Sequence, residues 1–180
     1  MKKLNLGCGN VLMEGYINLD NNPNTKPDII HNLNNYPYPF SDSEFDEIYL
    51  DHTIEHLEDS IRLMQELYRI GKNDCTIIIK CPHFSCNWFH PGHKTAISSK
   101  FFTFFDNKNI ENYGKTDFKV LVRKLYWIRN GYLTNRSVAI KITDKIINFI
   151  ANVHIGFAER VWCYWVGGFE EIYFKAKVIK

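Results

Sequence analysis

The sequence predicts an α/β fold of the Rossmann-like, three-layer sandwich type, with a mostly parallel seven-stranded sheet. Three observations support this prediction: short β-like runs surround an amphipathic helical segment, a glycine-rich turn closes the first run, and Ile77-Ile78-Ile79 is apolar without alternation. A strand that is apolar on both sides is typical of a parallel sheet covered on both faces. The 180 residues, 45% of them hydrophobic, suffice for one core, so we expect a single domain over residues 1–180.

Five β-like runs lie in the first half, and each is too short for a helix. The predicted strands span residues 3–6, 16–19, 28–30, 47–50 and 76–80, with turn signals such as Gly9-Asn10 between them. Between the fourth and fifth runs, apolar residues recur at intervals of three and four, which predicts an amphipathic helix ending at a glycine cap. These residues are Ile54, Leu57, Ile61, Met64, Leu67 and Tyr68, followed by Gly71.

The second half gives a weaker pattern. Residues 82–94 are rich in His, Pro and aromatic side chains, which favours an ordered loop over a site. Beyond this loop we expect a short helix at 98–105, a strand at 118–127, a helix at 143–153 and a final strand at 171–179.

Composition and charge restrict the class of protein. The N-terminus lacks an apolar signal-peptide core, and no run approaches the roughly 18 apolar residues of a membrane span. Five cysteines, odd in number and irregularly spaced, fit reduced thiols, so we expect a cytoplasmic protein. Residues 115–145 carry eight basic and two acidic side chains, which indicates a solvated surface or contact with an anionic substrate or membrane headgroup.

A glycine-rich turn and an acidic residue indicate a nucleotide-like ligand. Asn5-Leu6-Gly7-Cys8-Gly9-Asn10 closes the first strand with two glycines, which permit positive φ and close approach of a ligand, although a plain tight turn uses them too. Asp20 ends the second strand, where α/β folds place a carboxylate that accepts hydrogen bonds from ribose hydroxyls; the alternative is a loop Asp that caps a turn. Eleven steps separate Gly9 from Asp20, against about 20 in dinucleotide-binding units, so the first crossover helix is shortened.

A series of short segments carries a joint signal through its order and spacing. The segments are Leu4-Asn5-Leu6-Gly7-Cys8-Gly9, Gly15-Tyr16-Ile17-Asn18-Leu19-Asp20, Tyr38-Pro39-Phe40, Phe45-Asp46-Glu47-Ile48, His52-Thr53-Ile54-Glu55-His56-Leu57, Pro82-His83-Phe84-Ser85 and Pro91-Gly92-His93-Lys94. In this order they resemble the class I S-adenosylmethionine-dependent methyltransferases, and among them the small methyltransferase-11-like branch. The resemblance covers most of the chain and continues more faintly to residues 167–178.

The resemblance implies a binding site for S-adenosyl-L-methionine in residues 1–80 and an acceptor-side half in residues 81–180. Gly7, Cys8 and Gly9 would line the methionine part of this cofactor, and Asp20 would hold its ribose. Asn5 stands where the family often has an acidic residue. Asn5 still accepts a hydrogen bond there but offers no charge to the sulfonium.

The resemblance also places residues at the ends of the third and fourth strands. Asn32 and Leu33 would border the adenine, and Asp51 and His52 would face the methionine and the transferable methyl group. These positions agree with the general rule that open α/β sheets bind ligands outside the carboxyl ends of their strands.

Methyl transfer to a hydroxyl requires an aligned nucleophile and a base that removes its proton. The candidate catalytic bases are His52, His56, His83 and His93. His56 is favoured because it falls in the first turn of the predicted helix, where the dipole disfavours the imidazolium. The alternative is that His56 is an ordinary residue at a helix start.

A dense group of potential metal ligands lies in the predicted loop. The spacing of these residues matches no familiar zinc pattern, so we expect no metal. They are Cys81, His83, Cys86, His90 and His93.

The expected activity is S-adenosylmethionine-dependent methyl transfer to a small-molecule acceptor, with a sugar or glycolipid precursor as one candidate. The alternatives are a catalytically silent module that binds a cofactor or partner, and an NAD-dependent oxidoreductase, which the short glycine-to-acid spacing disfavours. Nucleic acid is a disfavoured acceptor, because the N/D-P-P-Y/F tetrapeptide of amino-methylating enzymes is missing from the sequence.

An apolar stripe in the last third has two interpretations. It is expected to pack on the sheet as core, as helical apolar stripes usually do. The other interpretation is an exposed surface beside Lys141, Lys145 and Arg160, suited to a lipid-linked acceptor, a membrane interface or a homodimer. The stripe comprises Ile146, Phe149, Ile150, Val153 and Phe157, next to Trp162, Tyr164, Trp165 and Phe169.

Overall fold

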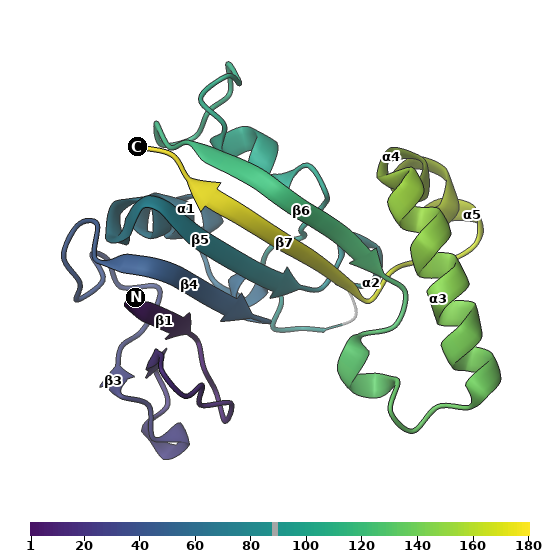
Figure 1. Ribbon diagram of the computed structural model, residues 1–180, viewed down its shortest axis with the longest axis horizontal. Helices are drawn as coiled ribbons and strands as arrows, with labels where there is room; N and C mark the ends of the chain where they lie inside the picture. Colours follow the sequence, from purple (N-terminus) through teal and green to yellow (C-terminus); the bar gives the residue numbers. More distant parts are fainter. Residues whose placement is uncertain (88–89) are drawn as a thin grey trace.

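One sheet organises the protein. The computed structural model describes residues 1–87 and 90–180, and within them seven strands pair in the order β3-β2-β1-β4-β5-β7-β6 (Figure 1). Only β7 runs antiparallel to its neighbours, so the predicted mostly parallel seven-stranded sheet is confirmed. The strands are β1 (Lys3–Leu6), β2 (Ile17–Asp20), β3 (Ile29–Ile30), β4 (Phe45–Asp51), β5 (Gly71–Cys81), β6 (Phe118–Tyr126) and β7 (Glu171–Val178).

The core lies on one face of this sheet. Alternate residues of β1, β4, β5 and β7 point to that face and are fully buried, as in Leu4, Ile48 and Phe174. Helix α1 (Ser60–Ile70) covers them with a buried stripe that includes Met64 and Leu67. The amphipathic spacing seen in the sequence therefore produces the packing that joins helix and sheet.

The helix before β5 begins later than predicted. Ile54 lies in a separate 3-10 turn, η2 (Ile54–His56), and Leu57 has extended backbone dihedral angles. The carboxylate of Asp59 then accepts hydrogen bonds from the backbone N–H groups of Ile61 and Arg62, which fixes the start of α1 at Ser60. Gly71 closes the helix with an N–H bond to the Leu67 carbonyl but adopts φ −74°, so its conformation is not the left-handed cap that we expected.

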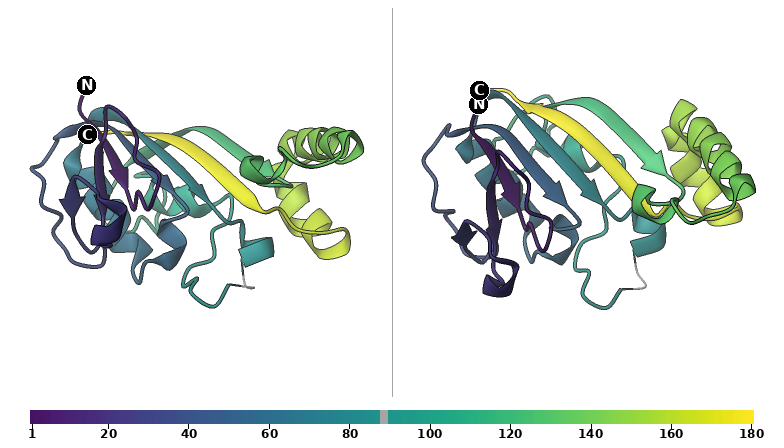
Figure 2. Two further views of the ribbon diagram at one scale, coloured as in Figure 1. Left: turned by 90° about the horizontal axis from the view of Figure 1, so that it is seen from below. Right: turned by 60° about the horizontal axis from the view of Figure 1, so that its bottom comes forward.

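The other face of the sheet is thinly covered, contrary to the prediction of full cover on both faces. Figure 2 shows, edge on, that the helical segments between β4 and β6 lie on one side of the sheet. Between β1 and β2 the chain forms only turns, and between β2 and β3 only the 3-10 turn η1 (Pro23–Thr25). These connections are shorter than the dozen or so residues that a crossover helix needs. Tyr49, Ile78 and Tyr173 on this face are consequently only half-buried.

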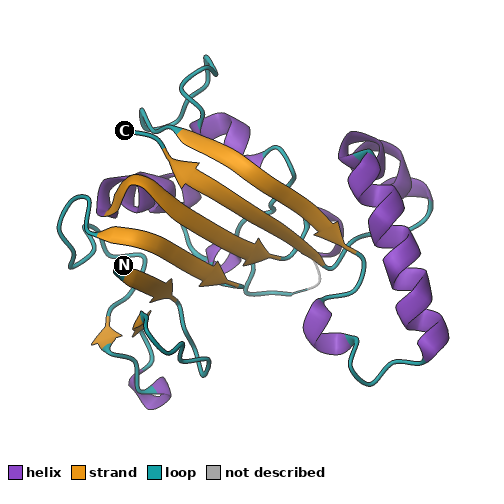
Figure 3. Cartoon of the chain, in the orientation of Figure 1, coloured by secondary structure: helices purple, strands orange, loops and turns teal. Residues whose placement is uncertain are grey.

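The second half adds the remaining elements (Figure 3). The predicted helix at 98–105 is a 3-10 turn, η3 (Phe101–Phe105), and the predicted strands at 118–127 and 171–179 are β6 and β7. The predicted helix at 143–153 starts five residues earlier, as α3 (Val138–Val153), because Ser137 caps it. The shorter segments are α2 (Phe84–Asn87), η4 (Asn130–Tyr132), α4 (Ile155–Phe157), the π-helical η5 (Ala158–Trp162) and α5 (Cys163–Trp165).

Removal of the α1 cap provides a test of this local structure. Asp59→Ala deletes the acceptor for two N–H groups, so we expect the free energy of unfolding to fall by about 1 kcal/mol in urea denaturation. The control is Glu111→Ala, a change of an exposed side chain outside any helix, which should leave the midpoint unchanged. Equal midpoints for both variants and the parent would show that the cap contributes nothing.

Candidate functional site

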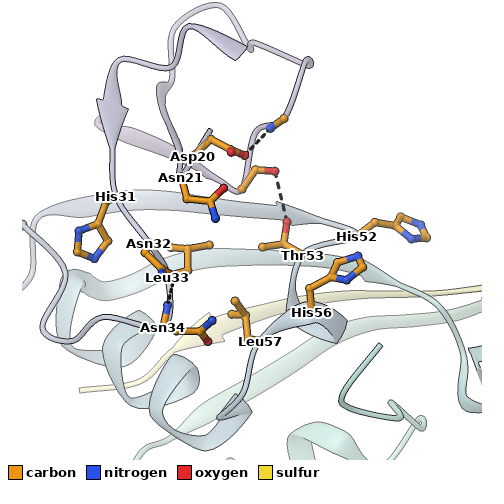
Figure 4. Close-up of a pocket in the computed structure, with 12 residues that line it drawn as sticks. Asp20, Asn21, His31, Asn32, Leu33, Asn34, His52, Thr53, His56 and Leu57 are labelled. Carbon is orange, nitrogen blue, oxygen red and sulfur yellow. Dashed lines mark hydrogen bonds between the residues drawn. The ribbon is translucent and has the colours of Figure 1, made fainter. Parts of the chain in front are cut away.

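A cavity of about 380 Å³ opens at the carboxyl ends of β1, β2 and β4. Figure 4 shows Asp20 and Asn21 above the cavity, His31 to Asn34 at one end, and His52 and His56 at the other. The cavity is elongated, and its two ends differ in chemistry. Its lining residues are Gly7, Gly9, Asp20, Asn21, His31, Asn32, Leu33, Asn34, His52, Thr53, His56 and Leu57.

The glycine turn forms one wall of the cavity. Gly7 has φ +67° and Gly9 has φ +50°, conformations that disfavour side chains. A Cβ on Gly7 would lie 2.5 Å from the side chain of Thr53, so only glycine lets this turn pack against Thr53. The N–H groups of Gly7 and Cys8 both donate to the carbonyl of Leu19, which ties the turn to the end of β2.

Asp20 is held in place by two backbone donors. One carboxylate oxygen accepts from Gly9 N–H at 2.8 Å and the other from Asn22 N–H at 2.9 Å. A carboxylate has about four lone-pair positions, so each oxygen retains capacity for a further hydrogen bond. The side chain thus combines the alternative turn-capping role with an oriented, unused acceptor on the cavity wall.

The end of the cavity beyond Asp20 combines apolar and amide groups. Leu33 and Leu57 are almost fully buried there. The side chain of Asn32 accepts from Asn34 N–H, and that of Asn34 accepts from Glu58 N–H, both at 3.0 Å. This end offers an apolar floor with a polar rim, which suits a flat heteroaromatic ring.

A smaller cavity of about 120 Å³ shares Gly7 with the larger one. Asp51 Oδ1 is buried in it without a hydrogen-bond donor among the described residues, and Arg129 Nη2 lies 3.5 Å away. A buried carboxylate oxygen without a donor is suited to an incoming N–H group. The lining is Asn5, Gly7, Cys8, Val11, Tyr49, Asp51 and Arg129.

Asn5 and Cys8 line the smaller cavity, but the Asn5 amide already makes hydrogen bonds within the protein and the Cys8 thiol is disfavoured as a thiolate. The Asn5 amide donates to the Val11 carbonyl and to Asn18 Oδ1, both at 3.0 Å, and so holds the β1–β2 connection. Burial, aided by the charge of Asp20, raises the pKa of Cys8, which disfavours a thiolate. Both residues therefore shape the wall.

His52 is held as a cation. It has φ +49°, and its ring nitrogens lie 3.2 Å from Glu55 Oε1 and 3.2 Å from Glu171 Oε2. Burial alone would lower the pKa of His52, but the carboxylates of Glu171 and Glu55 outweigh burial and raise it to about 9. A protonated imidazole cannot accept a proton, so this environment disfavours His52 as a base at neutral pH.

His56, which lines the cavity, lies in a group of three histidines. The ring centroids of His56, His90 and His93 lie 4.4 to 5.6 Å apart. His56 Nδ1 lies 3.2 Å from the Gly92 carbonyl, so it carries the proton and leaves Nε2 as an acceptor. His56 belongs to a three-residue 3-10 turn, which has little dipole. The orientation of the His56 ring therefore depends on its contact with the Gly92 carbonyl and not on a helix dipole.

These three histidines have atoms within 4.8 Å of one another, as metal ligands would. However, His90 Nδ1 accepts from Gly92 N–H at 3.1 Å, which places the His90 proton on Nε2 and leaves no free lone pair on that ring. The donor set therefore does not favour a metal in this conformation.

The other three residues of the potential metal-ligand group, Cys81, His83 and Cys86, lie apart from His90 and His93. His83 is fully buried between Ser85 Oγ at 2.7 Å and Glu159 Oε1 at 3.0 Å, and it lines neither cavity. Cys81 is buried in β5, and burial raises the pKa of its thiol. The structure thus separates His83, Cys81 and Cys86 from His90 and His93, and His83 is part of the interior packing.

Sequence reasoning missed several lining residues. Arg129 follows β6 and reaches the smaller cavity only because the antiparallel β7 brings β6 into the same sheet, and no local motif indicates this. Asn34 and Thr53, by contrast, adjoin residues that we selected. The missed residues are Val11, Asn21, His31, Asn34, Tyr49, Thr53, Leu57 and Arg129.

Comparisons with known proteins identify relatives of this architecture. Residues 4–79 match the family model described as a methyltransferase domain. No curated protein matches the chain. A SAM-dependent methyltransferase from Archaeoglobus fulgidus is 19% identical, with 98% of this chain and 85% of that chain covered and a TM-score of 0.57.

Two further solved structures share the fold. An S-adenosylmethionine-dependent methyltransferase from Mesorhizobium loti is 12% identical, with 98% of this chain and 90% of that chain covered and a TM-score of 0.61. A chain of the complex between the Haloferax volcanii Trm112 methyltransferase activator and a methyltransferase is 15% identical, with 99% and 83% covered and a TM-score of 0.61. At these identities the likeness shows the fold.

The charge state of His52 can be measured. Its pKa of about 9 lies above the usual 6.5, so the ion pairs stabilise the folded state fully below pH 6.5, and this contribution is lost as the pH rises through 9. The shift corresponds to a stabilisation on the order of 3 kcal/mol. We expect an NMR titration to place the His52 imidazole near pH 9, and His52→Asn to reduce stability at pH 6 more than at pH 10. An imidazole that titrates near 6.5, or no change on Glu171→Gln, would refute the assignment.

Proposed function

We propose that the chain is a class I S-adenosylmethionine-dependent methyltransferase, with its cofactor-binding half in residues 1–80, and that it methylates a hydroxyl of a small-molecule acceptor. A sugar or glycolipid precursor fits this proposal. One observation supports it: a single cavity leads from a nucleoside-like end, past an oriented carboxylate, to the His56 ring, whose Nδ1 faces the Gly92 carbonyl. The acceptor-side half is residues 81–180.

The residues of the two cavities fit S-adenosylmethionine, which supplies an electrophilic methyl group when bound. We assign the ribose hydroxyls to Asp20 and the adenine to the end formed by Asn32, Leu33 and Leu57. The methionine end would enter the smaller cavity past Gly7 and the backbone of Cys8.

Charged groups of the smaller cavity complement that end of the cofactor. Asp51 Oδ1, which lacks a donor among the described residues, would accept from the ammonium group. Arg129 would bind the carboxylate. Fixed charges of both signs within one small cavity orient the ligand as well as bind it.

His56 is the proposed general base. Its Nε2 would take the hydroxyl proton while the acceptor oxygen forms the new bond to the methyl carbon, and the bond from that carbon to sulfur breaks with its electron pair left on sulfur. His90 and His93 lie beside His56 and would position the acceptor. His52, as a cation, would hold Glu55 and Glu171 in place and take no proton.

The sequence left two alternatives, an NAD-dependent oxidoreductase and a catalytically silent binding module. An oxidoreductase is disfavoured, since the family match and the eleven-step spacing from Gly9 to Asp20 both point away from NAD. A silent binding module would keep the cofactor contacts and lack turnover. One relative forms a complex with a methyltransferase activator, so a partner protein is compatible with the proposal, as is a homodimer.

Calorimetric titration tests the cofactor site. S-Adenosylhomocysteine should bind the parent protein, and Asp20→Ala should weaken binding by about 1–3 kcal/mol because charged acceptors to the ribose are lost. Asn24→Ala, an exposed change beside β2, is the matched control and should bind as the parent does. Binding of NAD in place of the thioether, or unchanged affinity in a folded Asp20→Ala protein, would overturn the assignment.

Transfer of labelled methyl groups tests the proposed base. With labelled S-adenosylmethionine and a panel of sugar nucleotides and polyprenyl-linked sugars, His56→Asn should lower kcat by about 100-fold or more and leave S-adenosylhomocysteine affinity nearly unchanged. His31→Asn, a change at the opposite end of the same cavity, should retain kcat. Label that enters none of these acceptors, or full turnover by His56→Asn, would argue against the proposal.

A further inference from the structure

Helix α3 turns its polar side toward the protein. Asp144, Asn148 and Asn152 follow one another at intervals of four and form one stripe. The Asn152 amide pairs with both backbone groups of Leu125, at 2.8 Å each, while Asn148 accepts from Trp127 N–H at 2.7 Å. The hydrogen bonds thus fasten the polar stripe to the end of β6.

The apolar side of α3 consequently points away from the sheet. Phe149 is 72% exposed, and Ile142, Ile146 and Val153 on the same side are also exposed. An amphipathic helix of a globular protein normally does the reverse and buries its apolar stripe. The expectation that this stripe packs as core is therefore wrong for α3.

The segments after α3 extend the same kind of surface. Trp165 is 85% exposed, although aromatic side chains of this size are usually buried. A contiguous patch of apolar residues on a solvent-exposed surface marks an interaction site. The exposed members after α3 are Phe157, Val161, Tyr164, Trp165 and Val166.

Every exposed charge of this region is positive. Between residues 136 and 168 the acidic residues are Asp144 and Glu159, and both are buried in hydrogen bonds with the protein. Lys145 and Arg160 are exposed, and Lys141 borders the apolar stripe. A second copy of the chain would bring like charges together, whereas an anionic surface would neutralise them.

We propose that the α3–α5 segment, residues 138–165, docks this protein on the surface of an anionic lipid bilayer. Exposed aromatic and aliphatic side chains flanked by lysine and arginine are the pattern of helices that lie in the membrane interface. No helix among the described residues has the length and apolarity to cross a membrane.

The docking surface lies at the edge of the sheet where the cavities open. Figure 1 shows α3 beyond the carboxyl end of β6, and Arg129, between β6 and α3, lines the smaller cavity. If the proposed acceptor class is right, a lipid-linked acceptor is presented at this edge. The membrane contact itself rests on α3–α5 alone and does not require that acceptor.

Vesicle flotation tests the contact with the full chain. The protein should float with vesicles of phosphatidylcholine and phosphatidylglycerol at about 0.05 M salt, and should be released at about 1 M salt or with phosphatidylcholine alone. Ile142→Ser/Ile146→Ser/Phe149→Ser should reduce the floated fraction by about tenfold or more, as should Lys141→Glu/Lys145→Glu. Ile110→Ser, which alters a fully exposed apolar residue elsewhere, is the matched control and should float normally.

Each outcome is decisive because folding and cofactor binding are followed separately by circular dichroism and S-adenosylhomocysteine titration. A folded protein that stays unbound at low salt overturns the proposal. A dimer in light scattering that the triple serine variant converts to a monomer overturns it in favour of a second copy. Flotation that the serine and charge variants do not change would place membrane contact elsewhere. If the parent protein does not bind S-adenosylhomocysteine, the proposed function is wrong, but the flotation result still decides the membrane contact.

Discussion

The joint between β1 and β2 determines most of this structure. Two N–H groups of the glycine turn donate to the Leu19 carbonyl, and Gly9 donates to the Asp20 carboxylate. A short loop can make these bonds only if Gly7 and Gly9 adopt left-handed conformations. These hydrogen bonds position β2 beside β1, as a crossover helix does in larger α/β proteins. They hold two strand ends side by side, form a wall of the larger cavity and leave one face of the sheet thinly covered.

Local patterns in the sequence predicted the elements that depend on local physics. Residues 3–6 form a strand because short-range sterics and alternation favour it, and the glycine turn was recognisable from residue type alone. The late start of α1 was missed because Ile54 and Leu57 continue the apolar spacing, while a single carboxylate at Asp59 decides where the backbone becomes helical. Periodicity predicts that a helix exists better than it predicts its first residue.

The histidines show where sequence reasoning cannot reach. The sequence favoured His56 as the base only through a predicted helix start, whereas the environments of His52, His56 and His83 depend on distant partners. Glu171, 119 positions from His52, makes that ring a cation, and Glu159 removes His83 from the cavities. His56 owes its tautomer to a carbonyl in another loop. Tertiary contacts of this kind assign protonation states, and a one-dimensional pattern does not contain them.

The polar stripe on α3 also limits association of the molecule through the edge of its sheet. Strand β6 is an edge, and an edge strand with unpaired N–H and C=O groups is a template for another chain. Asn152 imitates a neighbouring strand by offering a donor and an acceptor to Leu125, and Asn148 satisfies the next N–H group along. These two side chains thereby close the end of an edge that would otherwise grow by strand addition. The helix can therefore turn its apolar side outward without leaving that strand end open to a second sheet.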